Sequence, residues 1–181
     1  MKKKTLLAGL ALGLAASLAV SSVASARPQA EDQQRRDQVA KKLQDMARLL
    51  TPFDSIGFNM SGPAVVLQGF CTKAVIKQDA EKAVKELDWV SHVVNEIEFI
   101  PADPAGIDIR QETLSILMKA IPQSFPNNYA NIRIKVDQAY NVTLVGEIAP
   151  GDEKRLEAAI VRINHLPLVK GVDNQVQTRT N

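Results

Sequence analysis

The sequence carries one pattern of strand and helix signals twice, and this repeat is what most constrains the fold. Residues 65–69, Val-Val-Leu-Gln-Gly, are followed 77 positions later by Val-Thr-Leu-Val-Gly at residues 142–146. A second segment, Val-x-x-Val-x-Asn-x-Ile/Val, occupies residues 90–97 and recurs 79 positions later at residues 169–176. A period this long is too large for a solenoid unit. It indicates two tandem small domains, and the longer second interval points to two extra residues in a tolerant loop or helix start.

The N-terminal residues have the pattern of an export signal. Three lysines at positions 2–4 precede a largely apolar run over residues 6–23, and Ala-Ser-Ala follows at 24–26. This order is that of a secretory signal peptide, which we predict over residues 1–26. The alternative is an uncleaved membrane anchor, because the apolar run approaches the length that spans a bilayer. No cysteine lies near the predicted cleavage site, so we expect a periplasmic protein that is not lipidated.

Removing this leader changes the electrostatic interpretation. The sequence has 22 basic and 20 acidic residues, and the loss of three lysines leaves 19 basic residues and a net charge of −1. The positive charge therefore belongs to the leader and is no argument for a nucleic-acid partner. Cys71 is the single cysteine, which excludes an intramolecular disulfide. We expect a buried thiol there, and the alternative is a mixed or intermolecular disulfide.

Hydrophobic periodicity predicts the order helix, strand, strand, helix, strand in each copy. In the first copy we expect a helix ending before Pro52, strands over 56–60 and 64–69, a helix over 76–87 and a strand over 93–100. In the second copy we expect a helix over 108–121, strands over 132–136 and 142–148, a helix over 156–163 and a strand over 172–178. Asp108 and Gln111 have the spacing of a capping box, so the third helix is predicted to begin at Asp108.

The predicted fold class is therefore α+β, with two tandem αββαβ sandwiches, each a three-stranded sheet packed by two helices. The expected bounds are 32–101 for the first domain, 102–107 for a linker and 108–181 for the second domain. Each domain has roughly 70 residues, near the lower limit for an independent apolar core. This small size is a structural reason for the two domains to pack against and stabilise each other.

The repeated motifs, Val-x-Leu-x-Gly, an amphipathic helix and Val-x-x-Val-x-Asn-x-Ile/Val, resemble the BON domain of bacterial osmotic-stress and nodulation proteins. Two copies behind a signal peptide resemble the dual-BON periplasmic proteins. The resemblance implies small α/β sandwiches and a non-catalytic role in the cell envelope, generally binding of phospholipid or the membrane surface in support of envelope integrity or stress tolerance. Some dual-BON relatives are lipoproteins, and this chain lacks the lipidated cysteine.

The shared motif residues have structural explanations. Gly69 and Gly146 end strands, where a glycine lets the chain bend toward the following helix. Asn95 and Asn174 are expected to hold a turn or strand entrance by side-chain hydrogen bonds. For all four positions we favour a structural role over ligand binding.

Catalytic chemistry has little support in the sequence. His92 and His165 have no histidine counterparts in the repeat, and neither their spacing nor that of Cys71 matches a nucleophile pair or a metal site. We find no phosphate-binding glycine loop and no nucleophile elbow. We therefore expect no enzyme, no metal and no cofactor.

The candidate binding surface is an excess of apolar residues on the predicted helix over 109–121. At about 100° per residue, Ile109, Ile116 and Ala120 cluster opposite the face expected to pack on the sheet, with Lys119 beside them. We predict that this face binds phospholipid or a partner protein, and the alternative is that it packs against the first domain. Trp89 is the other candidate, and there a half-buried cap on the core is favoured over a membrane anchor.

Two function classes stay open. The first is a peripheral module that binds phospholipid or the membrane surface, as the resemblance implies. The second is a periplasmic protein-interaction module that docks on an outer-membrane or cell-wall protein, which the nearly neutral charge favours.

Overall fold

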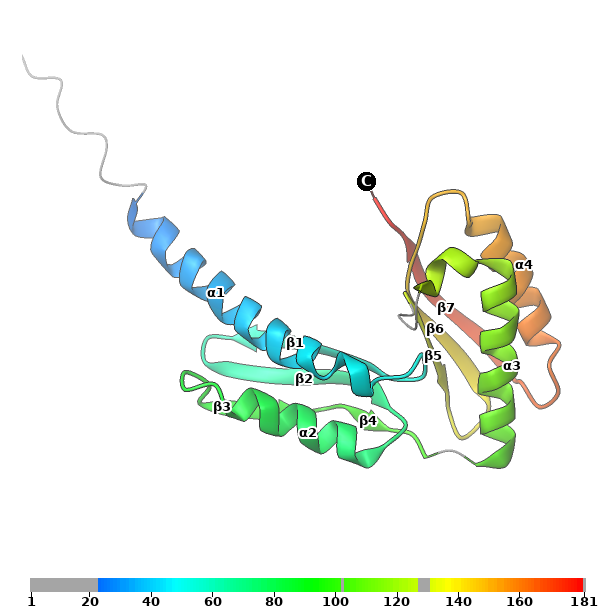
Figure 1. Ribbon diagram of the computed structural model, residues 1–181, viewed down its shortest axis with the longest axis horizontal. Helices are drawn as coiled ribbons and strands as arrows, with labels where there is room; N and C mark the ends of the chain where they lie inside the picture. The colour runs from blue at the N-terminus through cyan, green and yellow to red at the C-terminus, as the bar shows by residue number, and fades with distance from the viewer. Residues whose placement is uncertain (1–22, 102, 127–130, 181) are drawn as a thin grey trace, which may run out of the picture. The chain divides into compact units, whose positions relative to one another are not determined.

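The computed structural model describes residues 23–101, 103–126 and 131–180 (Figure 1). The chain divides into two compact units, Met1–Arg35 and Arg36–Asn181. All but the last four residues of the predicted signal peptide lie outside the described residues, and those four belong to the start of the first helix. Within the described part of the chain, no helix is both long and apolar enough to cross a membrane.

In the first half of the chain, residues 36–101 place helices on one face of a small sheet (Figure 1). Its elements in order are α1 (Val23–Asp45), the 3-10 helix η1 (Ala47–Leu49), β1 (Ser55–Ser61), β2 (Ala64–Cys71), α2 (Ala74–Lys85), β3 (His92–Asn95) and β4 (Glu98–Phe99). Strand β2 is central: it pairs antiparallel with β1 and parallel with β3 and β4. Val39 of α1, Val65 and Leu67 of β2, and Ile76 and Val84 of α2 are among the buried residues of one core.

The second half, from residue 103, repeats this arrangement (Figure 1). Its elements are α3 (Pro104–Ala120), the 3-10 helix η2 (Pro122–Ser124), β5 (Ile132–Val136), β6 (Asn141–Ile148), α4 (Glu153–Asn164) and β7 (Gly171–Thr178). Strand β6 pairs antiparallel with β5 and parallel with β7. Ile132, Ile134 and Leu144 of the sheet pack with Leu117 of α3 and Ile163 of α4. The mixed α+β fold, with four α-helices and two sheets in the described residues, fits a BON-like α/β fold.

Three predicted elements differ from the structure. The helix predicted to end just before Pro52 ends at Asp45, and the 3-10 helix η1 follows it. The strand predicted over 93–100 is divided into β3 and β4, with Glu96 and Ile97 between them. The capping box at Asp108 is wrong, because α3 begins four residues earlier at Pro104. Asp103 is the N-cap, and its Oδ1 accepts a 2.6 Å hydrogen bond from the Gly106 amide. Proline suits the first helical turn because its missing N–H would have no intrahelical partner there. Residues 104–107, predicted as linker, therefore belong to α3.

Candidate functional site

Helix α3 presents different residues to solvent from those the sequence predicted. Ile109 is only 4% exposed and belongs to the core of the second half. Ile116 and Ala120 are partly buried against the same core. The prediction of an outer face formed by these three residues is therefore wrong for Ile109 and only partly right for the other two. The physical reason is that α3 packs on both the sheet and α4, so a wider arc of the helix is covered than a single stripe requires.

The large apolar side chains of α3 that are exposed are Ile107 and Met118, at 46% and 48% exposure. They lie 11 residues apart, which is close to three helical turns, and therefore share one side of the helix. Leu114 lies between them on that side and is partly buried against the core. We call Ile107, Leu114 and Met118 the apolar flank. Lys119 is exposed beside Met118.

An open groove of about 730 Å³ runs between α3 and the end of α4. Ile116 and Leu166 supply partly buried apolar surface, and Val161 is 57% exposed. The lining residues include two permanent cations and one acid, so the groove carries an excess positive charge. The full lining is Glu112, Ser115, Ile116, Lys119, Val161, Arg162, His165 and Leu166. Such a surface suits a ligand that has both an apolar and an anionic part.

The first half has a groove in the corresponding place, between α1 and the end of α2, but with different chemistry. It is lined by Gln38, Lys41, Lys42, Asp45, Glu86, Leu87, Asp88 and Trp89, so acids outnumber bases. Lys42 and Glu86 form an ion pair of 2.8 Å. The Trp89 indole donates a hydrogen bond to Gln38 and its ring packs against the core. Trp89 therefore caps the core of the first half, and a role in membrane contact stays a prediction.

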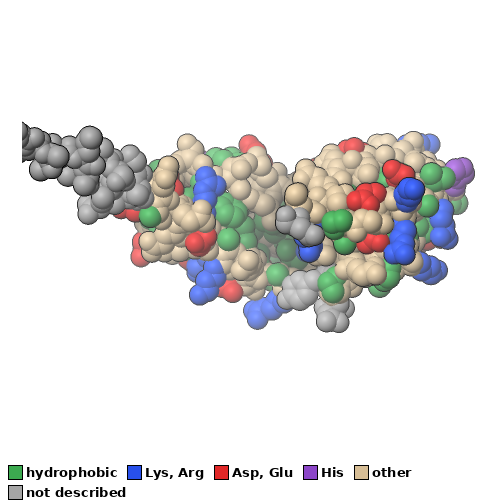
Figure 2. Space-filling model, turned by 90° about the horizontal axis from the view of Figure 1, so that it is seen from above, with side chains coloured by type: hydrophobic (Ala, Val, Ile, Leu, Met, Phe, Trp, Pro, Cys, Tyr) green, Lys and Arg blue, Asp and Glu red, His purple; other side chains and the backbone are tan. Residues whose placement is uncertain are grey.

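The face drawn in Figure 2 shows how dispersed the apolar surface is. Hydrophobic side chains of the described residues occur there in small patches among Lys, Arg, Asp and Glu. Scattered apolar side chains are normal on a protein surface, so this face alone does not mark a binding site.

The glycines and asparagines of the repeated motifs occupy matching positions. Gly69 and Gly146 have φ values of +119° and +134°. A Cβ on Gly69 would lie 2.1 Å from the Ser55 carbonyl oxygen, and one on Gly146 would lie 1.9 Å from the Asn131 carbonyl oxygen. Both positions therefore exclude a side chain, so sheet geometry alone accounts for the two glycines.

Asn95 and Asn174 each accept a 3.2 Å hydrogen bond from the amide two residues onward, at Ile97 and Val176. Both asparagines pair with the corresponding leucine of the central strand, Leu67 in the first sheet and Leu144 in the second. These contacts give both asparagines a backbone-capping role in the sheets.

The two histidines and the cysteine have different surroundings. His165 Nδ1 lies 2.6 Å from the Val161 carbonyl oxygen of its own helix, and His92 is exposed on β3. Cys71 is fully buried, and burial, reinforced by the charge of Asp54, raises the pKa of its thiol. Among the described residues, no three His, Cys, Asp or Glu side chains are grouped to hold a metal ion.

A polar junction that the sequence analysis missed centres on Asp54. Its carboxylate is fully buried and accepts hydrogen bonds from the amide and hydroxyl of both Thr51 and Thr72, at 2.6 to 2.9 Å. The loop that Asp54 holds meets β5: the Pro52 carbonyl accepts from the Ile134 amide at 2.9 Å, and Phe53 packs against the core of the second half. The spacing Thr-x-x-Asp at 51–54 was the available sequence signal.

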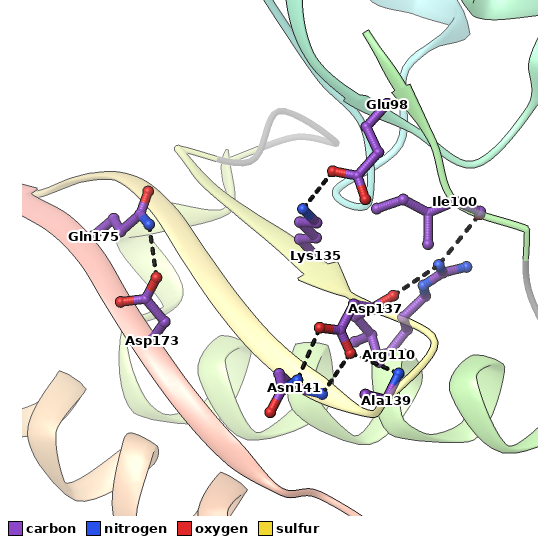
Figure 3. Close-up of polar contacts among 10 residues, drawn as sticks. Glu98, Ile100, Arg110, Lys135, Asp137, Ala139, Asn141, Asp173 and Gln175 are labelled. Atoms are coloured by element: carbon purple, nitrogen blue, oxygen red, sulfur yellow. Dashed lines mark hydrogen bonds and ion pairs between the residues drawn. The ribbon is translucent and has the colours of Figure 1, made fainter.

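Two arginines complete this junction. Arg133 donates to the Thr51 carbonyl at 3.1 Å, and Arg110 donates to the carbonyls of Ile100 and Val136 at 3.5 and 3.3 Å. Burial lowers the pKa of both arginines, and the charge of Asp54 opposes that effect. Figure 3 shows the Arg110 contacts beside the Lys135–Glu98 ion pair. The arginines bond backbone carbonyl groups and the lysine pairs with an acid, so we assign these contacts a structural role.

Comparison with known proteins bears on the first half. The BON domain family matches residues 31–101. This match indicates one BON domain, in the first half of the chain. This domain contains Gly69, Asn95 and Trp89 and ends just before α3, so the apolar flank lies outside it. None of the curated proteins matches the sequence.

Solved structures add little to this BON assignment. CdsD, a structural protein of the type III secretion system of Chlamydia trachomatis, is 11% identical, with 79% of this chain and 91% of that chain covered and a TM-score of 0.28. The C-terminal domain of CdsD is 13% identical, with 80% and 96% covered and a TM-score of 0.28. Similarity at this level carries no argument about fold or function.

Proposed function

We propose that this protein is a non-enzymatic periplasmic envelope protein that binds phospholipid or the membrane surface through α3, in support of envelope integrity or stress tolerance. The proposal includes export by a signal peptide over residues 1–26 and a second BON domain over residues 108–181 preceded by the first turns of α3. The BON domain at 31–101 supports it, because this family is generally non-enzymatic and associated with membranes or phospholipid.

The observation that carries the proposal is the difference between α3 and α1. The two grooves align Gln38, Lys41, Lys42 and Asp45 of α1 with Glu112, Ser115, Ile116 and Lys119 of α3. In this alignment Leu114 and Met118 of the apolar flank correspond to Ala40 and Gln44. Helix α3 thus replaces smaller and polar groups with large apolar ones, and nearly half of the Met118 surface is exposed. Exposed apolar side chains next to cations are typical of helices that lie in a membrane interface.

A second BON domain is supported by the shared topology. The order of strands and helices, the direction of each strand pairing and the positions of the glycine and asparagine agree between the two halves. The divergence then lies in the helices, where the second half has gained apolar surface and positive charge in its groove. Duplication followed by specialisation of one surface would produce this pattern.

The experiment that tests the proposed function is co-sedimentation of the mature chain, Arg27 to Asn181, with liposomes. Vesicles of anionic and of zwitterionic phospholipid are compared over a salt series. We expect pelleting with anionic vesicles that weakens as salt screens Lys119 and Arg162. Absence of pelleting at low salt would overturn lipid binding and favour the alternative, docking on an outer-membrane or cell-wall protein.

A further inference from the structure

Strand β7 leaves a long free edge on the second sheet. It has eight residues, and in the described part of the chain nothing pairs with its outer side. The other edges differ: β3 and β4 are short and separated, and β5 is met by the Pro52 carbonyl. Strand β1 is also an edge, but it carries no charged residue. A free edge of this length presents unpaired N–H and C=O groups on which another strand can add.

The backbone groups that point outward from β7 can be identified. The Arg179 amide donates to Ile148 of β6, so odd-numbered residues point inward to the sheet. Successive residues of a strand direct their backbone groups to alternate sides. The amides and carbonyls of Val172, Asn174, Val176 and Thr178 therefore face the free edge.

The Val176 amide donates a 3.2 Å hydrogen bond to the Asn174 side chain, which occupies this outward donor. In the first half the matching asparagine is fixed, because Asn95 Nδ2 also donates to the Lys77 carbonyl at 2.8 Å and to Glu81 at 3.0 Å. Within the described residues, Asn174 makes only the bond to Val176, and its side chain is exposed. A single exposed hydrogen bond of this kind contributes about 1 kcal/mol or less, so an incoming strand can displace it.

We propose that the β7 edge is a strand-addition surface whose occupant is β7 of a second molecule, paired antiparallel about Val176. In this register Val176 lies opposite Val176 of the second molecule, and Asn174 lies opposite its Thr178. The outward amides and carbonyls of the two strands then form hydrogen-bonded pairs. Asp173 then lies opposite Arg179 of the second molecule, on the same face of the joined sheets. The two-fold symmetry forms this ion pair twice, which is the charge complementarity that favours a second copy as the occupant.

The present partners of these charges do not prevent the pairing. Arg179 lies 3.5 Å from Glu147, with both side chains more than half exposed. Asp173 accepts a 2.7 Å hydrogen bond from Gln175, which Figure 3 shows on β7. Exposed contacts of this kind contribute little to stability, so they can rearrange when a second strand arrives. The proposal does not depend on lipid binding, since α3 is not part of the β7 edge.

Analytical ultracentrifugation of the mature chain over a concentration series tests the proposal. We expect a monomer–dimer equilibrium that Asn174→Ala shifts toward dimer by roughly threefold to tenfold, since the variant removes the competing side chain. Thr178→Pro removes an outward amide and the exposed 3.2 Å bond from the Thr178 hydroxyl to Glu153, but leaves the ladder to β6 in place. It should weaken dimerisation by roughly tenfold or more. A melting temperature close to that of the wild type is required of each variant.

Charge reversal keeps the test informative if Thr178→Pro does not fold. Asp173→Arg alone should weaken the dimer, and Asp173→Arg combined with Arg179→Asp should restore it. A protein that stays monomeric at every concentration, with Asn174→Ala included, would overturn the proposal. So would a dimer that is equally stable in the single and double charge variants.

Discussion

The Asp54 carboxylate accepts hydrogen bonds from both the amide and the hydroxyl of Thr72, at 2.7 and 2.9 Å, across 18 residues of sequence. These bonds join the chain just before β1 to the residue just after β2. Thr51 donates the other two bonds to the same carboxylate. Because Asp54 is fully buried, its charge is tolerated only while these donors surround it. The bonds from Thr51 and Thr72 to Asp54 also fix the loop whose Pro52 and Phe53 contact the second half.

Replacing Asp54 by alanine should therefore destabilise the protein strongly. We expect the free energy of unfolding to fall by about 2–4 kcal/mol, because four donors lose a charged acceptor in a buried site. Urea denaturation followed by circular dichroism measures this change. Asp88→Ala, at an exposed acid, is the control and should change stability by less than about 0.5 kcal/mol. Equal effects of the two variants would contradict the role of Asp54.

The two motif glycines should be intolerant of even the smallest side chain. Gly69→Ala and Gly146→Ala should each lower the free energy of unfolding by more than about 2 kcal/mol, because the positive φ and the nearby carbonyl oxygen both oppose a Cβ. Gly57→Ala is the matched control, since its Cβ would meet nothing within 4 Å. That substitution should be neutral or slightly stabilising. Chemical denaturation of the three variants distinguishes backbone strain from a general loss of strand flexibility.

Truncation of Ile109 should cost much more stability than truncation of Ile107, although the two residues stand two positions apart on α3. Ile109→Ala removes a core side chain and should cost about 2–4 kcal/mol of stability. Ile107→Ala removes a side chain that is 46% exposed and should cost less than about 1 kcal/mol. Thermal and urea unfolding of both variants provide the comparison. A large loss of stability in Ile107→Ala with a small loss in Ile109→Ala would contradict this orientation of α3.

The N-cap of α3 should make a small contribution to stability that disappears in acid. The Gly106 amide and the Tyr140 hydroxyl lower the pKa of Asp103 by bonding its ionised form. A carboxylate with a depressed folded pKa stabilises the fold above its unfolded pKa and loses that effect as the pH falls through the folded value. The loss is therefore expected below the ordinary aspartate pKa of about 3.9.

Carbon NMR titration of the Asp103 carboxyl measures this shift directly. Tyr140→Phe should bring the pKa of Asp103 part of the way back toward the ordinary value, while the bond from Gly106 keeps it depressed. The stability difference between wild type and Asp103→Asn should shrink on acidification. An unchanged difference between neutral pH and pH 3 would contradict the capping role.

Local periodicity predicted most of the secondary structure because each half buries a simple hydrophobic pattern. Val65 and Leu67 alternate on β2 as expected, and Val142 and Leu144 do the same on β6. The start of α3 was missed because two capping signals compete within six residues, and the proline after Asp103 decides between them. The division of the strand after Asn95 has no such explanation, because Asn174 makes the same 3.2 Å side-chain cap and β7 continues through it.

The candidate site was less predictable than the fold. A helical wheel gives the relative positions of side chains but not the direction in which the sheet and the neighbouring helix lie. Ile109, Ile116 and Ala120 were therefore grouped correctly but assigned to solvent, whereas contacts with the sheet and α4 cover them. Asp54, Arg110 and Arg133 were missed because their partners are distant in sequence, and only the tertiary structure brings such charges together.

The most direct test of the account is liposome binding by variants of the apolar flank. Ile107→Glu combined with Met118→Glu places two charges on exposed positions of α3, and Val75→Glu is the control at a 53% exposed position of α2. Co-sedimentation with anionic vesicles at low salt measures each protein, and circular dichroism checks its fold. We predict that the α3 variant loses binding by roughly tenfold or more while the control binds like wild type. Wild-type binding by a folded α3 variant would contradict the assignment of α3 as the membrane-contacting surface.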